Sequence, residues 1–580
     1  MIDVRIRKIY LRFETEYMGK IQKLTQLFII IGIIFVVNVI ANYYYTSADL
    51  TEEKRYTLSP STYDVVEELP DNLFIKVLLD GDFPAGFMRL QNATSELLDD
   101  LKDINPNIQY IFEDPLEGTV QDIKSRREIL AKDGIIPINL TYNNGKEVVQ
   151  KGIYPYAIIS YRNRKSTVSL LKEQNLNEDD EVTLNRSIEL LEYKFVNLIQ
   201  KLSKNDKETI AFSTGHGELP YEKTIRLEAE LDRFYNVGRL NLDSLVSISQ
   251  ELDLLIVPAP TVPFDDKAKF KLDQYIMNGG KVMWFIEKLN ADLDSINKYK
   301  FYVPRDIETD LDDLLFKYGA RVQPNLVLDL ECTQIPQVVG QQDGKIQQAL
   351  YNWYYHPLAI ANVDHPIGKN LDRVNMFFPS TIDTIRTKFN VKKTPLLTSS
   401  PYSRFQLNPV RLNFEILKFP PKQEQFNKGK QTLGLLLEGE FESAYKNRIT
   451  PGFQAGLDEL GITFQAKSPA TKQMVFSDVD FMKNSVSLRD NKSRPIGFNV
   501  WEQRVYDGNK DFILNAVEYM LDGSGVLDSR SKLVKLRLLD AVKTKKERKK
   551  WQFINIVAPL LFLALFGIGF NYFRRRRYRK

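Results

Sequence analysis

The residues best suited to chemistry form the tetrapeptide Gly215-His216-Gly217-Glu218, which follows an apolar segment that predicts a strand. In open α/β sheets, ligands bind beyond the carboxyl ends of the parallel strands. Two glycines would let backbone amides approach a ligand there, while His216 and Glu218 could bind it or exchange protons. The other interpretation is a tight turn in which the glutamate caps the next helix. The sequence favours the turn and keeps ligand binding by these four residues as a hypothesis.

Signatures of nucleotide and metal chemistry are missing. Gly279-Gly280-Lys281 is followed by Val282, so no P-loop is present, and no G-x-G-x-x-G occurs. The chain has 3 histidines, and none are spaced as paired metal ligands. We therefore expect no nucleotide, no metal and no other cofactor in this chain.

Nucleophilic catalysis is poorly supported too. Cys332 lies in DLECTQIP without a glycine-flanked elbow, and Ser524 lies in a Gly-Ser-Gly loop rather than in G-x-S-x-G. The sequence predicts that the protein is not an enzyme. A hydrolase using His216 and Glu218 is the least favoured alternative.

Composition narrows the class of protein further. The chain has 580 residues, 43% hydrophobic content, a net charge of +4 and 1 cysteine. A single cysteine excludes internal disulfides and multi-cysteine metal sites. Much of the positive charge lies near the two ends, which leaves the long middle near neutral and argues against nucleic-acid binding. An extracytoplasmic domain without disulfides suits a bacterium.

Alternating strand and helix patterns surround the tetrapeptide. A strand starts at Glu208, residues 222–234 predict an amphipathic helix, and Asp253–Pro260 reads as a strand buried on both faces. A further helix ends at Gly279-Gly280, and KVMWFIE predicts the next strand. The pattern predicts a doubly wound layer of Rossmann or flavodoxin type.

Two further regions flank this layer. Before it, strand 73–80, helix 88–104 and strand 107–115 predict a parallel α/β layer, followed by a hairpin turning at 143–146, a strand at 156–161 and a helix at 184–202. After it, strands are expected at 322–328, 373–378, 396–399, 432–438 and 474–477, a helix at 511–521 and a helical stalk at 526–542.

Apolar runs near both ends predict membrane spans at residues 24–45 and 552–573. Each has roughly the 20 residues that a helix needs to cross a bilayer. Basic residues before the first run place the N-terminus in the cytoplasm by the positive-inside rule, and Arg574–Arg577 place the C-terminus there as well. We expect a bacterial inner-membrane protein with a large periplasmic ectodomain.

A second basic cluster directly precedes the second run. It could grip anionic lipid headgroups, or it could be a solvated basic helix end. Its members are Lys543, Lys545, Lys546, Arg548, Lys549 and Lys550.

The fold class expected is therefore α/β, in a two-span membrane protein with a multi-unit ectodomain. The expected divisions are a basic N-terminus (1–23), a first span (24–45), a first α/β unit (46–204), a Rossmann- or flavodoxin-like unit (205–310), a mixed α/β extension (311–525), a basic stalk (526–550), a second span (552–573) and a basic tail (574–580).

Several segments together resemble one known family, the auxiliary component of gliding-motility-associated ABC transporters (GldG type). They follow the family's order along nearly the whole ectodomain. The segments are LDGDFPAGFMRLQNATSELLDDL (79–101), NRSIELLEYKFVNLIQKL (185–202), TGHGEL (214–219), FFPSTID (377–383), LLLEGEFESAYKNR (435–448), FSDVDFMKN (476–484) and NKDFILNAVEYM (509–520).

The resemblance implies a complex with a separate ABC ATPase and a membrane permease, in the role of an auxiliary or substrate-binding subunit. It carries no catalytic residues. Two functions follow: a subunit that couples the partner ATPase and permease to a periplasmic substrate or protein, or a mechanical adaptor that binds gliding or secretion machinery without carrying a solute.

Overall fold

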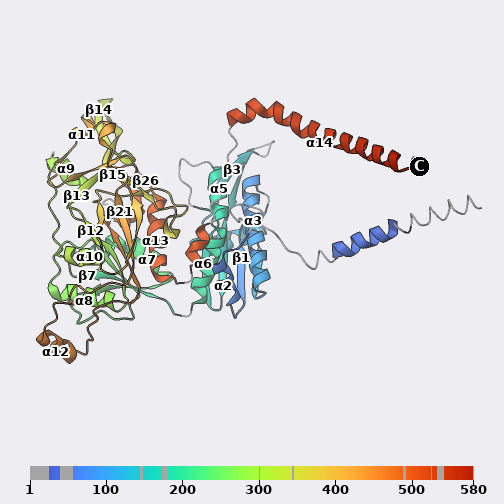
Figure 1. The fold of residues 1–580 in the computed structure, drawn as a ribbon. Coiled ribbons are helices and arrows are strands. Elements are labelled where there is room, and N and C mark those ends of the chain that lie inside the picture. The colour runs from blue at the N-terminus through green and yellow to red at the C-terminus, as the bar shows by residue number, and fades with distance from the viewer. Residues whose placement is uncertain are drawn as a thin grey trace, which may run out of the picture. The chain divides into compact units, whose positions relative to one another are not determined.

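The computed structural model describes most of the chain, and its parts are drawn in Figure 1. The described residues are 25, 27–39, 57–81, 83–143, 148–172, 180–204, 206–299, 301–342, 345–487, 491–523, 525–531 and 541–578. The chain divides into two compact units, Met1–Thr57 and Leu58–Lys580. In the first unit, Leu27–Val39 forms a short apolar helix. The other positions of the span expected at 24–45, residue 25 apart, lie outside the described residues.

A four-stranded sheet, which we call the small layer, opens the second unit. Its strand order is β2 (Ile108–Phe112), β1 (Leu73–Val77), β5 (Tyr156–Tyr161) and β6 (Arg164–Ser169). The predicted parallel pair is confirmed, since β1 and β2 run parallel across α3 (Ala85–Ile104). The layer as a whole is mixed, because the further strand expected at 156–161, β5, runs antiparallel to β1.

The chain between β2 and β5 explains this reversal. It forms α4 (Val120–Lys132) and then the predicted hairpin, β3 (Ile138–Asn143) with β4 (Val148–Ile153). A hairpin does not provide the right-handed helical crossover that a further parallel strand requires. Three helices complete the small layer: α2 (Pro60–Glu67), α5 (Asp180–Glu189) and α6 (Leu191–Ser203).

The larger sheet contains the strand before the tetrapeptide. Five strands run parallel in the order β8-β7-β9-β10-β22, and the sheet continues antiparallel through β21, β18, β15 and β14. The strands are β7 (Thr209–Thr214), β8 (Asn236–Asn241), β9 (Leu254–Pro258), β10 (Lys281–Phe285), β14 (Cys332–Gln342), β15 (Lys345–Ala361), β18 (Lys392–Thr398), β21 (Thr432–Gly439) and β22 (Thr471–Phe476).

Helices cover both faces of the parallel strands. Successive strand residues point to opposite faces. Accordingly, Ile210 and Phe212 join one core with α7 (Tyr221–Asp232) and α13 (Asp507–Leu521). Ala211 joins a second core with α8 (Asp266–Met277) and α10 (Asp312–Tyr318). All five residues of β9 are buried, as the continuous apolar run predicted. Burial on both faces leaves only the ends of β9 near the surface.

The region after the parallel strands departs most from its predicted pattern. The single strand expected at 322–328 is wrong, because Pro324 separates β12 (Ala320–Val322) from β13 (Asn325–Asp329) and each pairs with a different partner strand. The long β14–β15 hairpin was not among the predicted strands. Two irregularities in its register interrupt the alternation that would have indicated it.

The remaining elements are short. They are α9 (Leu293–Tyr299), β11 (Phe301–Tyr302), η1 (Pro366–Gly368), β16 (Val374–Asn375), β17 (Ile382–Thr384), β19 (Ser403–Leu407), β20 (Leu412–Asn413), α11 (Glu415–Lys418), η2 (Gln423–Gln425), α12 (Pro451–Glu459), β23 (Asn484–Val486), β24 (Ser493–Ile496), β25 (Phe498–Asn499), β26 (Arg504–Val505) and η3 (Val526–Ser531).

The C-terminal helix α14 (Ala541–Tyr578) carries the second predicted span. Its stretch Lys550–Arg577 has 28 residues and contains an 18-residue window with a mean hydropathy of 2.3, and among the described residues it is the one helix long and apolar enough to cross a membrane. The predicted stalk begins with the 3₁₀ turn η3, and residues 532–540 lie outside the described residues.

Candidate functional site

The tetrapeptide Gly215–Glu218 directly follows β7, whose neighbours β8 and β9 both run parallel to it. The chain leaves β7 at the position where the strand order reverses. Gly215 has φ +116° and Gly217 has φ +71°, values that side chains other than glycine rarely adopt. The two glycines therefore shape a tight turn at the carboxyl end of the strand.

The side chains of this turn point at one another. Glu218 accepts hydrogen bonds from the Ser213 hydroxyl (2.9 Å) and from the backbone N–H of His216 (2.7 Å). The His216 ring, 4% exposed, stacks on Phe264 with ring centroids 3.7 Å apart, and its Nε2 lies 3.5 Å from Asp243 Oδ1. Its Nδ1 has no hydrogen-bond partner among the described residues. Both carboxylate oxygens of Glu218 thus stabilise the turn, and one nitrogen of His216 is buried without a partner among the described residues.

A neighbouring loop closes over the turn. Thr261 donates its backbone N–H to the carbonyl of His216 (2.9 Å) and its hydroxyl to the carbonyl of Gly217 (3.0 Å). A Cβ added at Gly217 would lie 2.2 Å from Thr261 Oγ1. Because this contact leaves no room for a side chain, the glycine is explained by packing. Ligand binding at the tetrapeptide stays a prediction.

Three carboxylates gather beyond two other strands of the same sheet. Glu287 follows β10, Asp478 and Asp480 follow β22, and one oxygen from each lies within 4.8 Å of the others. Burial raises the pKa of Glu287 and of Asp478, and Lys483 forms an ion pair with Asp480. These three residues were not among the predicted site residues, although acidic residues after two buried strands were the available signal. The Lys483 ammonium offsets charge here, so the cluster has a counterion within the chain.

The segments that carry the family resemblance meet beside this cluster. The backbone N–H of Phe377, in FFPSTID, donates to Asp478 of FSDVDFMKN (3.0 Å). Asn509, in NKDFILNAVEYM, donates from its side chain to the carbonyls of Asn375 (2.9 Å) and Phe481 (3.0 Å). These motifs are accounted for by buried hydrogen bonds that hold loops at the carboxyl ends of β10 and β22.

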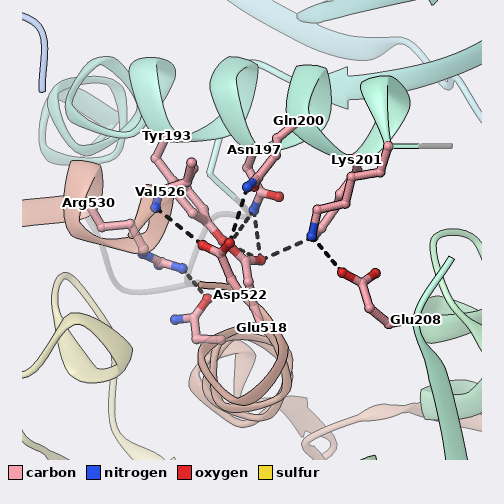
Figure 2. Close-up of polar contacts among 11 residues, drawn as sticks. Tyr193, Asn197, Gln200, Lys201, Glu208, Glu518, Asp522, Val526 and Arg530 are labelled. Carbon is pink, nitrogen blue, oxygen red and sulfur yellow. Dashed lines mark hydrogen bonds and ion pairs between the residues drawn. The ribbon is translucent and has the colours of Figure 1, made fainter. Parts of the chain in front are cut away.

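A second polar cluster, drawn in Figure 2, joins α6 of the small layer to α13, which packs on the large sheet. Glu518 of α13 is 5% exposed and accepts hydrogen bonds from three side chains on one face of α6. The donors are Tyr193 Oη (3.1 Å), Asn197 Nδ2 (2.8 Å to each oxygen) and Lys201 Nζ (3.1 Å). Burial, with the Glu518 charge as the next cause, raises the pKa of Tyr193.

The chain continues from this cluster toward α14. Asp522, at the end of α13, accepts from Gln200 Nε2 of α6 (3.1 Å) and from the backbone N–H of Val526 (3.3 Å), which starts η3. These contacts have no signal in the sequence, because Glu518 and its partners on α6 lie more than three hundred residues apart.

The predicted lipid-contacting residues begin α14. Lys543, Lys545, Lys546, Arg548, Lys549 and Lys550 all lie within this helix, ahead of its apolar stretch. Arg548 and Lys550 are exposed. Cations at this position suit either headgroups or water, so lipid contact stays a prediction.

A comparison with protein families decides the class of protein. The family model described as an ABC-type uncharacterized transport system matches residues 207–516. The chain belongs to this family. A second family model, described as a domain of unknown function, matches residues 52–160, which cover much of the small layer. This family member therefore has a role in an ABC-type transport system, and the apolar helix in α14 indicates association with a membrane.

Comparisons with individual proteins add little. No curated protein matches the chain. Among solved structures, the chain is similar to one described as the mmIFT52 N-terminal domain, with 12% identity over 55% of this chain and 98% of that one and a TM-score of 0.30. It is also similar to the exo-beta-1,4-mannosidase Op5Man5 from Opitutaceae bacterium strain TAV5, with 8% identity over 51% of this chain and 34% of that one and a TM-score of 0.18. Neither TM-score supports a shared fold.

Proposed function

We propose that this chain is a non-enzymatic, membrane-anchored subunit of an ABC transporter associated with gliding motility. It couples a partner ATPase and permease to a periplasmic substrate or protein. The observation that carries the proposal is a transport-family region followed by an apolar helix, in a chain without a nucleotide-binding motif. Because the chain carries no ATPase signature, the energy comes from a partner.

The topology proposed is that of two spans, with both termini in the cytoplasm. Support comes from the basic residues before the first apolar run and from Arg574–Arg577 after the second. The parallel strands of the large sheet form a doubly wound layer in this proposal, with strand order and helices on both faces as support. The basic residues at the start of α14 contact anionic headgroups in this proposal, and the turn at Gly215–Glu218 binds a ligand, with the unpartnered His216 Nδ1 as support.

The route for coupling runs through α13. Glu518 and Asp522 bind α6 of the small layer, Val526 follows within hydrogen-bonding distance of Asp522, and α14 comes next along the chain after residues 532–540. Because buried, charge-assisted hydrogen bonds hold α6 to α13, a displacement of the membrane helix reaches the small layer through this contact.

A mechanical adaptor is the second candidate function. One surface favours it: the β14–β15 hairpin exposes Val338, Val339 and Ile346, and residues 332–342 contain no charged side chain. Exposed apolar side chains on a strand without charges are typical of a protein-binding edge. The adaptor binds envelope proteins of the gliding or secretion machinery at this edge.

Crosslinking on the native membrane separates the two functions. A photoreactive residue at Val339 that crosslinks to an envelope protein outside the transporter supports the adaptor. A crosslink to the permease, or to a soluble periplasmic cargo, supports the coupling subunit. The matched control is a photoreactive residue at Val246, which follows β8 and is 62% exposed. Equal labelling from both positions would contradict the adaptor.

A further inference from the structure

A cavity of about 320 Å³ lies beside the Glu518 cluster, between the small layer and the large sheet. Its walls come from β6, α6, the end of α7, α13 and Arg530 of η3. Much of the lining is apolar and includes Leu198 of α6, Leu231 of α7, Phe234 after α7 and Leu514 of α13. Small-molecule sites in proteins have this size and this mixture of apolar walls with few polar groups.

Arg530 is the unusual polar group of the cavity. It is 5% exposed, its guanidinium lies over the ring of Tyr193 at 4.7 Å, and it donates one hydrogen bond to the Asn515 amide. Its Nε has no hydrogen-bond partner, and no carboxylate pairs with it among the described residues. A buried cation normally has a counterion, because removing it from water carries a large free-energy penalty.

The other cations of the cavity differ from Arg530. Lys201 pairs with Glu518 (3.1 Å), Lys172 with Asp372 (2.8 Å) and Lys510 with Glu230 (3.2 Å). Lys194 donates to the backbone carbonyls of Ser169 and Leu171. Arg233, also on the cavity wall, pairs with Glu230 (3.3 Å). Among the described cations of this wall, Arg530 is therefore the one held by neither a carboxylate nor backbone carbonyls.

A residue of the same cavity wall holds a second buried atom without a partner. Asn197 is 7% exposed and directs its Nδ2 at both oxygens of Glu518, which leaves its Oδ1 without a donor among the described residues. The opposite orientation of the amide would place Oδ1 against a carboxylate, so the hydrogen-bond network fixes the acceptor. Buried polar atoms are nearly always paired.

We propose that this cavity binds a small apolar carboxylate that also carries a hydrogen-bond donor. The carboxylate pairs with Arg530, the donor meets Asn197 Oδ1, and the apolar body lies against Leu198 and Leu514. A phosphate group fits less well, because a second negative charge would face Glu230 and Glu518 on the same walls. Hydrophobic amino acids blocked at the amine, and the ends of short peptides, have this chemistry.

The inference deepens the proposed function, since a ligand here would sit between the two layers that α13 joins. Binding is nevertheless measured on the isolated full-length chain, whereas the proposed function is tested by its partners. Either can fail while the other stands.

Calorimetry on the full-length protein in a non-ionic detergent tests the site, with N-acetyl-L-leucine as the probe. We expect saturable binding to the wild type, and at least roughly tenfold weaker binding to Arg530→Gln, because a charge-assisted hydrogen bond is lost. The neutral methyl ester of the probe should bind the wild type at least roughly tenfold more weakly than the probe itself, for the same reason. Arg162→Gln is the matched control, because Arg162 is an exposed arginine away from the cavity that pairs with Asp71.

Three results would overturn the proposal: no binding to the wild type at about 10 mM probe, equal binding of probe and ester, or equal binding to the wild type and Arg530→Gln. If Arg530→Gln does not fold, Leu514→Trp replaces it, because a larger side chain fills the apolar end and leaves the cation in place. Leu514→Trp should abolish binding, and unchanged affinity in that variant would also count against the site.

Discussion

Replacing Glu518 by alanine removes the acceptor at the centre of the contact between α6 and α13. The carboxylate is 5% exposed and takes hydrogen bonds from Tyr193, Asn197 and Lys201. Breaking a buried pair by removing one partner costs about 3–5 kcal/mol, because the other groups stay buried without a partner. The Lys201 side chain is 19% exposed and can reach water, so the lower part of this range applies.

Hydrogen exchange followed by mass spectrometry measures this change in the full-length protein. A loss of about 3 kcal/mol corresponds to roughly a hundredfold faster exchange in peptides from α6 (Leu191–Ser203), if opening of this contact exposes its amides. Glu230→Gln is the control on the same cavity. Its carboxylate is 32% exposed and pairs with Arg233 and Lys510, so its exchange should change less than about threefold. Protection of α6 that is the same in Glu518→Ala and Glu230→Gln would refute the reasoning.

Three further changes test the rest of the structure. His356 is fully buried among aromatic rings and burial lowers its pKa, so stability should fall as the pH drops below about 6.5, where the unfolded chain takes up the proton. In urea titrations at pH 7 and pH 5, His356→Phe should lose this dependence of the unfolding free energy on pH. An unchanged dependence would contradict the prediction. Three lysines lower the pKa of Glu442 to about 2, so its stabilisation is present above about pH 4.5 and is lost as the pH falls through 2. Because those lysines face water, Glu442→Gln should cost about 1–2 kcal/mol at pH 6 and little at pH 2.5, and a penalty that does not change with pH would contradict this. Gly217→Ala should lower the stability by about 2–4 kcal/mol in thermal melts, because of the left-handed backbone and the contact with Thr261. Gly134→Ala, with open space around its Cβ, should lower it by only about 1 kcal/mol. Equal losses of stability would argue against packing at the turn.

The parallel part of the large sheet was the most predictable from the sequence. The runs at Asp253–Pro260 and at KVMWFIE are apolar between their charged end residues, and a helix with clear start and stop signals separates them. Local pattern and tertiary burial agree in such units, so strand and helix follow from nearby residues alone. The tetrapeptide was placed correctly after its strand for the same reason.

The contacts between residues far apart in the sequence could not be predicted from local sequence patterns. Glu518 reads as one of many charged helix residues, and only the fold brings α6 against it. The orphan atoms of Arg530 and Asn197 have no sequence signal, because the same residues on a surface would be solvated. Pro324 divided an apolar run into two strands with different partners, a choice that depends on which edges are free elsewhere in the molecule.

The central claim is that this chain works inside a membrane complex with an ATPase that it does not itself contain. Affinity purification of the full-length chain from native membranes in a mild detergent, followed by mass spectrometry, tests it most directly. The account predicts that an ABC permease and an ATP-binding subunit are recovered with the chain in fixed proportion. Recovery of the chain alone, under conditions that keep other ABC complexes of the same membrane intact, would contradict it.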